Sequence, residues 1–304
     1  MNDKKEYDVV IIGGSYAGLS AAMALGRSLR TVLIIDSGKP CNIQTPHSHN
    51  FITQDGATPK DIFEKAKNQV LKYDTVEFLN DLAITTTKTT DVFLVNTNSI
   101  KNIKAKKVLF TTGVKDIMPN IKGFTECWGI SILHCPYCHG YEVAHKNLGI
   151  IANGKTAFEL CTLIQNWSNK LTLFTNGKSV LTEEQSNMIS KLNIEVIEKE
   201  IEEIIHTDGS IENISFKNGS KTNIDAIFSR VPFDQHCKIP LELGCKTTEP
   251  GHIEVDFFQK TNIKGVYAAG DNTSPFRAVS LATSSGTIAG AAINKELIKE
   301  SLPS

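Results

Sequence analysis

Two cysteines that lie two residues apart, Cys135 and Cys138, are the side chains in this sequence best suited to chemistry. A Cys-x-x-Cys pair can close and reopen a small disulfide, and this spacing lowers the pKa of one thiol, so that the attacking thiolate forms readily. The same cysteines with His134 or His139 could belong to a structural zinc site, but zinc normally takes two spaced pairs of ligands. Because the other five cysteines form no second pair, the pattern favours redox chemistry over zinc or inert core cysteines.

The composition is typical of a globular cytoplasmic protein. The chain has 304 residues, of which 40% are hydrophobic and 21% are charged, and this length fits two domains of ordinary size. A formal net charge of -1 argues against a nucleic-acid or anionic-membrane surface. No apolar run is long enough to span a membrane, and residues 1–7 show no signal-peptide pattern. Seven cysteines in so long a chain fit a reducing cytoplasm with one catalytic pair.

A glycine-rich turn follows the first predicted strand. The apolar run at residues 8–12 predicts a buried parallel strand, residues 19–29 predict a helix, and residues 31–35 predict a second strand that ends at Asp36. The turn between the first strand and the helix spans residues 13–18. Strand, glycine turn, helix, strand and acid together form the Rossmann fingerprint for a dinucleotide.

Each residue of this turn has a physical role in binding a dinucleotide. Gly13 permits the tight turn, and Gly18 allows the helix and the strand to pack closely. Ser15 stands where a glycine is usual, and its small side chain restricts the approach of a ligand only slightly. The N–H groups at the start of the helix can then bind a pyrophosphate, while Asp36 accepts hydrogen bonds from a ribose hydroxyl.

A second motif near the C-terminus indicates which dinucleotide is bound. Residues 265–271 form an apolar strand that closes with Gly270 and Asp271, and a segment of small residues follows at 279–292. This segment predicts a helix that packs tightly against something flat. FAD is long enough to extend from the first turn to this motif, where Asp271 can bind its ribitol. The helix that starts near Val279 can offer its N–H groups to a reduced flavin.

The middle of the chain repeats the first unit in a weakened form. Residues 148–151 and 171–174 predict strands on either side of a helix that extends to about Trp167. Ala152 replaces the first glycine of the turn, and Thr175-Asn176-Gly177 offers neither an acid for NAD nor an arginine for NADP. Two interpretations remain open: a weakened or lost nicotinamide site, and a retained fold that binds no ligand.

The domain crossings can also be placed from the sequence. We expect the chain to leave the first domain at residues 113–117 and to return at residues 229–233, where Pro232 marks the second crossing. Between these crossings, Asp208-Gly209 predicts the turn of a hairpin.

Three motifs together carry a resemblance to the low-molecular-weight thioredoxin reductases. They are Gly13-x-Ser15-x-x-Gly18, Cys135-Pro136-Tyr137-Cys138 and Ala268-Ala269-Gly270-Asp271, and the resemblance covers essentially the whole chain. It implies an α/β fold of two Rossmann-like domains, each doubly wound and three-layered, and usually a homodimer. The FAD domain is then split in sequence by an inserted NAD(P)H-type domain. We place the FAD domain at residues 1–114 and 231–304, and the inserted domain with the cysteine pair at residues 115–230.

The resemblance also assigns roles to individual residues. It implies that Cys138 lies nearer the flavin and that Cys135 attacks the substrate. The candidate catalytic residues are Cys135, Cys138 and His139, and we expect no metal site. The candidate cofactor-binding residues are Gly13, Ser15, Gly18, Asp36, Asn50, Gly113, Gly270, Asp271, Arg277, Ala278 and Val279.

The sequence departs from this family at three points. The second glycine motif is incomplete, the basic cluster for NADPH is absent after Phe174, and His139 stands where the family usually has an acid. NADPH is therefore a doubtful cofactor. The sequence Cys-Pro-Tyr-Cys-His-Gly is similar to the motif of flavin-dependent dithiol oxidases, and some related flavoproteins that take electrons from ferredoxin also lack the NADPH cluster.

These observations predict an FAD-dependent disulfide oxidoreductase that passes electrons between the flavin and the Cys135/Cys138 pair. The partner is a thioredoxin-like protein or a small dithiol or disulfide. An oxygen-using dithiol oxidase, a ferredoxin-linked reductase and a non-catalytic flavin-binding redox sensor are the alternatives. His139 can act as a general acid–base group, because an ordinary histidine titrates near neutral pH.

Overall fold

The structure, a computed structural model, describes residues 6–303, and the chain forms two compact units. Unit 1 comprises the described residues up to Ile43, Asn50–Lys115 and the residues from Phe233 onward. Unit 2 comprises Gln44–His49 and Asp116–Pro232. The chain passes between the units at Lys115–Asp116 and at Pro232–Phe233. The placement of Gln44–His49 in unit 2 was not expected.

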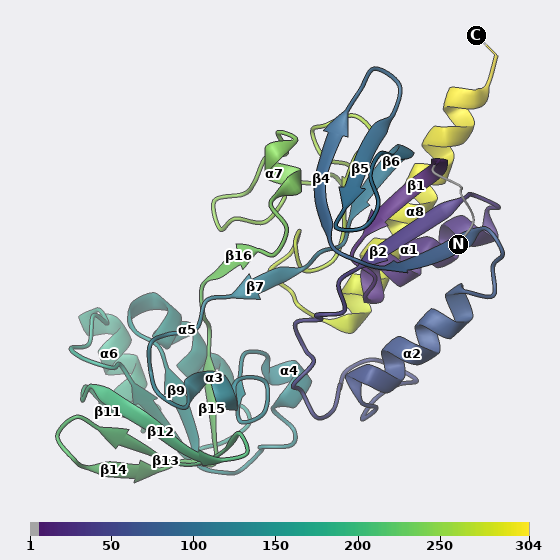
Figure 1. The fold of residues 1–304 in the computed structure, drawn as a ribbon. Helices are drawn as coiled ribbons and strands as arrows, with labels where there is room; N and C mark the ends of the chain where they lie inside the picture. Colours follow the sequence, from purple (N-terminus) through teal and green to yellow (C-terminus); the bar gives the residue numbers. More distant parts are fainter. Residues whose placement is uncertain (1–5, 304) are drawn as a thin grey trace. The chain divides into compact units, whose positions relative to one another are not determined.

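Unit 1 is built on a mixed sheet. Its described strands are β1 (Glu6–Ile12), β2 (Val32–Asp36), β3 (Val76–Asn80), β4 (Ala83–Lys88), β5 (Phe93–Thr97), β6 (Ile103–Phe110) and β17 (Val266–Ala268). The strand order is β3-β2-β1-β6-β5-β4, and β17 pairs with β6. Strands β2, β1, β6, β5 and β4 are labelled in Figure 1. Strands β1, β2, β3, β6 and β17 run parallel, whereas β4 and β5 pair in antiparallel fashion. Both faces of β1 are buried, which explains its continuous apolar run.

The helices of unit 1 are α1 (Tyr16–Arg27), α2 (Pro59–Val70), α7 (Ile239–Glu242) and α8 (Val279–Ser301). Helix α8 begins at Val279, as the sequence predicts, and it lies along α1 (Figure 1). Its small residues serve this helix–helix contact: a methyl group on Gly286 would collide with the backbone carbonyl of Ala17, and one on Gly290 would meet that of Ala21. The expectation of a flat partner for this segment is thus corrected, because its partner is another helix.

Unit 2 contains a parallel sheet and a smaller antiparallel sheet. The parallel strands, in the order β11-β10-β9-β15-β8, are β11 (Glu195–Ile197), β10 (Leu171–Phe174), β9 (Leu148–Ile151), β15 (Ala226–Ser229) and β8 (Ile132–Leu133). The antiparallel strands are β12 (Ile201–Thr207), β13 (Ser210–Phe216) and β14 (Lys221–Asn223). Asp208 and Gly209 both have positive φ and form the predicted hairpin turn between β12 and β13.

Four helices complete unit 2, and two short strands lie at the crossings. The helices are α3 (Phe124–Cys127), α4 (Pro136–His139), α5 (Gly154–Ile164) and α6 (Glu183–Lys191). The paired strands at the crossings are β7 (Val114–Asp116) and β16 (Phe233–Gln235). Among the helices of residues 6–303, none combines the length and the apolar character that crossing a membrane requires.

Candidate functional site

The Cys135/Cys138 pair lies at the short helix α4 in unit 2. Cys135 occupies the N-cap position in an extended conformation, and Pro136 takes the first helical position, where its missing N–H costs nothing. The backbone N–H groups of Cys138 and His139 both donate to the carbonyl of Cys135, at 3.3 and 3.2 Å. This turn holds the two sulfur atoms 2.7 Å apart. The local fold therefore supplies the proximity that a reversible disulfide needs.

The surroundings of Cys135 favour its thiolate. A hydrogen bond with the Cys138 thiol does most to lower the pKa of Cys135 to about 7; burial opposes this shift, and the N–H groups of Cys138 and Tyr137 support it. The buried cysteines behave in the opposite way. Burial raises the pKa of Cys161 to about 12 and that of Cys127 to about 11. Cys135 thus has the character of an attacking thiol, whereas these two buried cysteines do not.

His139, the last residue of α4, lies beside a second histidine. The rings of His139 and His49 are perpendicular, with their centroids 6.3 Å apart, and Nε2 of His49 is 3.5 Å from a carboxylate oxygen of Glu142. Burial lowers the pKa of His139, the charge of His49 adds to this effect, and Glu142 opposes it. Within the described residues, no three His, Cys, Asp or Glu side chains are grouped as metal ligands.

All the predicted cofactor-binding residues belong to unit 1, and the first glycine turn has the geometry that its motif predicts. Gly13 has a φ of 105°, and a side chain there would collide with the backbone of Thr111. The N–H of Gly14 donates to Oδ2 of Asp36 at 2.5 Å, and the hydroxyl of Thr111 donates to the carbonyl of Gly13 at 2.5 Å. The turn is therefore held in place by its neighbours, with the Asp36 carboxylate beside it.

Two helices of unit 1 begin without a side-chain cap. Ser15 is the N-cap of α1 but makes no side-chain hydrogen bond to the helix, and Ala278, the N-cap of α8, has no polar side chain. Neither helix has an acidic residue in its first turn. Their N-terminal N–H groups and dipoles are thus available to negatively charged groups of a cofactor. Nearby in sequence, the Arg277 guanidinium lies 5.4 Å from the ring centre of Phe233.

The other predicted cofactor residues in unit 1 lie at turns. Asn50, Gly113 and Gly270 all have positive φ values, of 60°, 63° and 90°. The N–H of Asn50 donates to Asp55 at 2.8 Å, and the N–H of Gly270 donates to the Ser285 hydroxyl at 3.1 Å. These bonds fix local loop geometry.

A buried residue that the sequence analysis did not single out, Asn272, follows Asp271. Its side-chain nitrogen donates to the carbonyl of Phe110 at 3.0 Å, whereas its Oδ1 atom is buried without a hydrogen-bond partner. The hydroxyl of Thr112 is also buried without a partner. Unpaired buried polar atoms are costly, and these two lie next to the Gly113 and Gly270-Asp271 turns. The adjacent Gly270-Asp271 motif was the signal that could have identified Asn272.

In unit 2, the side chain of Asn153 makes the hydrogen bonds of the turn between β9 and α5. Oδ1 of Asn153 accepts hydrogen bonds from the N–H groups of Gly154 at 2.8 Å and Val180 at 2.9 Å. Its side-chain nitrogen donates to the carbonyl of Lys178 at 2.9 Å. The same side chain therefore caps α5 and ties the turn to the loop after β10. Helix α5 ends at Ile164, slightly earlier than expected from the sequence.

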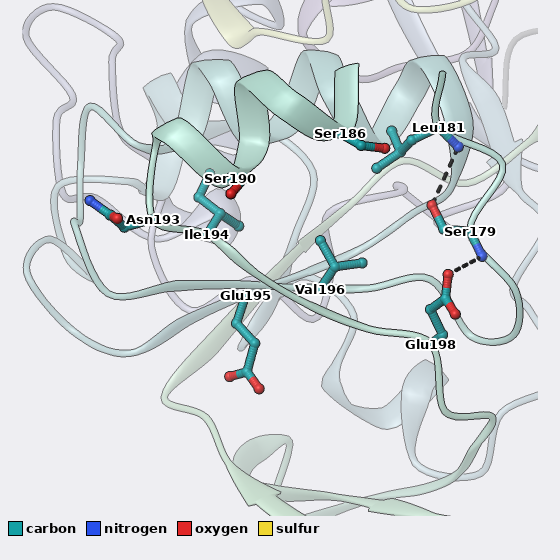
Figure 2. A pocket seen from close by; sticks show the side chains of 9 residues that line it. All are labelled: Ser179, Leu181, Ser186, Ser190, Asn193, Ile194, Glu195, Val196 and Glu198. Carbon is teal, nitrogen blue, oxygen red and sulfur yellow. Dashed lines mark hydrogen bonds between the residues drawn. The ribbon is translucent and has the colours of Figure 1, made fainter. Parts of the chain in front are cut away.

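The loop after β10 borders a pocket of about 580 Å³ (Figure 2). The pocket includes Ser179, Glu195 and Glu198, with no Lys or Arg among its lining residues. Figure 2 shows the Glu198 carboxylate directed at the backbone of Ser179, whose N–H donates to it at 2.9 Å. The lining therefore offers a phosphate no cationic side chain, which agrees with the absence of an arginine fork in the sequence.

Comparisons with known proteins place this geometry in a family context. Residues 7–287 match the family model described as pyridine nucleotide-disulphide oxidoreductase. The chain is 30% identical to thioredoxin reductase tcpT of Claviceps purpurea, over 99% of this chain and 97% of that protein. It is similar to the crystal structure described as thioredoxin reductase TrxB of Bacillus anthracis, with a TM-score of 0.92, 30% identity and coverage of 97% of this chain and 100% of that one. An oxidoreductase structure from Agrobacterium tumefaciens gives a TM-score of 0.91 at 31% identity, with coverage of 97% and 99%.

Proposed function

Because the chain belongs to the pyridine nucleotide-disulphide oxidoreductases, as a thioredoxin-reductase-like FAD enzyme, we propose that it oxidises external dithiols to disulfides through Cys135 and Cys138, with dioxygen as the final electron acceptor. The predictions of two Rossmann-type α/β domains, of FAD as the cofactor and of a disulfide oxidoreductase activity are confirmed. The direction of electron flow, the dithiol substrate and dioxygen as the acceptor are proposed.

The described residues of unit 1 fit FAD. The Gly13 turn and the uncapped start of α1 would bind the pyrophosphate, and Asp36 would bind the adenosine ribose. The start of α8 at Val279, with Asp271 and the unpaired Oδ1 of Asn272, would bind the polar edge of the flavin and its chain. When bound, FAD supplies a two-electron acceptor for the reduced cysteine pair and passes these electrons on.

The observation that carries the proposal is the side chain of Asn153. In the first dinucleotide turn, the N-terminal N–H groups of α1 have no side-chain partner. In the second turn, Asn153 binds the first N–H of α5 and also holds the loop after β10 against it. A nicotinamide dinucleotide needs both the turn for its pyrophosphate and that loop for its ribose. Because Asn153 is bound to both the turn and the loop, we expect the electrons to enter from a substrate dithiol rather than from a nicotinamide dinucleotide.

The cysteine pair and His139 would perform the thiol chemistry. A substrate thiol gives its proton to His139, and the resulting thiolate attacks Cys135 of the Cys135–Cys138 disulfide. The protein disulfide breaks, Cys138 leaves as a thiolate, and a mixed disulfide forms between the substrate and Cys135. The second substrate thiol then attacks the substrate sulfur of this bond, and its proton passes to the leaving sulfur of Cys135, which is released as a thiol. The substrate loses two electrons and two protons, and the cysteine pair gains the two electrons.

The reverse direction is the second candidate function. The names of the relatives tcpT and TrxB describe thioredoxin reductases, so the same pair would reduce a thioredoxin-like protein. In that case Cys135 attacks the partner disulfide and Cys138 resolves the mixed disulfide. This direction needs an electron donor, which would be NADPH or a one-electron carrier such as ferredoxin. A homodimer and a cytoplasmic location remain predictions.

Oxygen uptake tests the proposed direction. The FAD-loaded protein with dithiothreitol as the probe should consume one O₂ for each dithiol that becomes a disulfide. Cys135→Ser and Cys138→Ser should each lower this rate on the order of a thousandfold while retaining FAD. Cys41→Ser, a change at an exposed cysteine, serves as the control and should retain the rate. Full activity in both variants would show that the electrons do not pass through Cys135 and Cys138. NADPH-driven reduction of thioredoxin without oxygen uptake would establish the reverse direction.

A further inference from the structure

The segment Gln44–His49 contributes a histidine to the cysteine site. The segment lies early in the chain, yet it belongs to unit 2. Its Ser48 is buried, and Gln44 and Thr45 lie against Gly129, where an added methyl group would come within 3.0 and 3.1 Å of their side chains. This packing holds the segment against unit 2 and leaves His49 beside α4.

His49 lies between a carboxylate and the histidine that follows the redox pair. Its Nε2 is 3.5 Å from Glu142, and its ring centre is 6.3 Å from that of His139. The His49 side chain is 20% exposed and that of Glu142 is 41% exposed, so the pair is only partly screened by water. His47 lies two residues earlier in the same segment, and its ring centre is 6.4 Å from that of His49.

The two imidazoles have different charged surroundings. The Glu142 carboxylate lies 3.5 Å from Nε2 of His49, so a positive charge on the His49 ring has an anionic partner there. A second positive charge on His139, one ring away, would be repelled by the first. Burial of His139 acts in the same direction, because burial disfavours the charged form. The titratable groups that act on His139 are His49 on the segment and Glu142 after α4, and Cys135 and Cys138 lie on the same short helix.

We propose that His49, held by Glu142, is a positioning residue that keeps His139 neutral, so that His139 can accept the proton of an incoming substrate thiol. The inference rests on the proposed function, in which a substrate thiol must lose its proton before it attacks the protein disulfide. His49 itself touches neither substrate nor sulfur in this scheme, and it acts only through the charge on His139. The step remains balanced: the proton moves from the substrate sulfur to His139, and the thiolate electron pair forms the new S–S bond.

The test compares His49→Phe with His47→Phe in the full-length FAD-loaded protein. Phenylalanine keeps a ring at position 49 but removes the charge. The acidic limb of the pH–rate profile for dithiothreitol oxidation should move upward by about half a unit to one unit in His49→Phe. At a pH below this limb, the rate should fall roughly three- to tenfold relative to the wild type. In His47→Phe the limb should stay in place. Thermal unfolding checks that both variants are folded.

A second readout separates this inference from the proposed function. Carbon-13-labelled histidine allows NMR to follow the titration of His139, with His139→Gln used to assign its signal. The His139 titration should move to higher pH in His49→Phe whether or not the protein oxidises dithiols. An equal loss of rate at every pH, with an unchanged His139 titration, would show that His49 is merely structural and would overturn the inference. If the His139 titration shifts in His49→Phe but the protein does not oxidise dithiols, the proposed function is refuted and the inference about His49 stands.

Discussion

The backbone N–H of Val180 donates to Oδ1 of Asn153 at 2.9 Å, so the loop after β10 is joined directly to the turn before α5. The two residues are 27 positions apart, and the side chain of Asn153 also caps the helix through Gly154. One amide oxygen thus satisfies two backbone donors at the place where a dinucleotide would otherwise bind. These hydrogen bonds are part of the folded structure of unit 2.

Replacement of Asn153 by alanine should destabilise unit 2. The change removes the N-cap of α5 and leaves the N–H of Val180 without its acceptor. Loss of an N-cap costs about 1 kcal/mol, and we expect the free energy of unfolding to fall by about 1–2 kcal/mol in urea titrations. Asn166→Ala is the matched control, because Asn166 is exposed just after the same helix. Equal stability of Asn153→Ala and the wild type would show that these bonds contribute nothing.

Alkylation of the reduced protein should single out Cys135 among the partly and fully buried cysteines. Its pKa of about 7, lowered chiefly by the hydrogen bond with Cys138, gives a large thiolate fraction at neutral pH. Burial raises the pKa of Cys161 to about 12, so this residue should not react. Iodoacetamide labelling, followed by peptide mass spectrometry across pH, should give a half-maximal rate for Cys135 near pH 7. If the half-maximal rate is reached instead at a pH near the pKa of an ordinary thiol, this assignment is wrong.

Glu296 should make the stability of unit 1 depend on acidic pH. Burial alone would raise its pKa, but hydrogen bonds from Lys107, Lys260 and Tyr267 lower the pKa to about 2. A carboxylate with a lower pKa in the folded state stabilises the fold above its ordinary value of 4.5, and this contribution is lost as the pH falls toward 2. Glu296→Gln should lower the free energy of unfolding at neutral pH by about 2 kcal/mol.

The pH profile distinguishes this charge effect from a general loss of packing. Glu296→Gln should flatten the decline in stability between about pH 5 and pH 2. Glu300→Gln is the control: Glu300 also accepts from Lys107, at 2.6 Å, but its side chain is 40% exposed. We expect a smaller effect for Glu300 because water screens it more. Equal slopes for the wild type and Glu296→Gln would contradict the assigned role.

The features that could be predicted from the sequence depend on local patterns. Strands β9 and β10 have the predicted bounds, because short apolar runs between turns identify buried strands. The start of α8 at Val279 was predicted because the small-residue segment begins there. Its packing partner was not, because the choice between a helix and a flat ligand depends on where α1 lies in space. The cysteine pair was identified from four consecutive residues, whereas the short helix α4 that carries it was not predicted.

The features that were missed depend on contacts between distant parts of the chain. His49 and Glu142 are 93 residues apart, as the difference 142 − 49 shows, and no local pattern joins them. The sequence showed Asn153 only as part of a degraded turn, whereas its contact with Val180 requires the loop to fold back. Asn272 has an ordinary polar side chain in the sequence, and only its burial beside Phe110 reveals the unpaired oxygen.

From the hydrogen bonds of Asn153 at the second turn, we predict weak use of NADPH. Lys155 and Lys178, the nearby cations, are exposed single ammonium groups rather than an arginine fork, and the ammonium of Lys155 lies 3.9 Å from Glu159. Each charge-assisted phosphate bond that is missing removes about 1.5–3 kcal/mol. Two such losses move a micromolar site toward the millimolar range, because about 1.4 kcal/mol corresponds to a tenfold change in affinity.

Stopped-flow absorbance of the bound flavin, under anaerobic conditions, tests the direction of electron flow most directly. The protein is mixed in separate experiments with micromolar NADPH, micromolar NADH and dithiothreitol. We predict that dithiothreitol bleaches the flavin band fastest, and that NADPH acts slowly or not at all and no better than NADH. Rapid, saturable bleaching by micromolar NADPH would contradict the closed second turn and would establish an NADPH-dependent thioredoxin reductase.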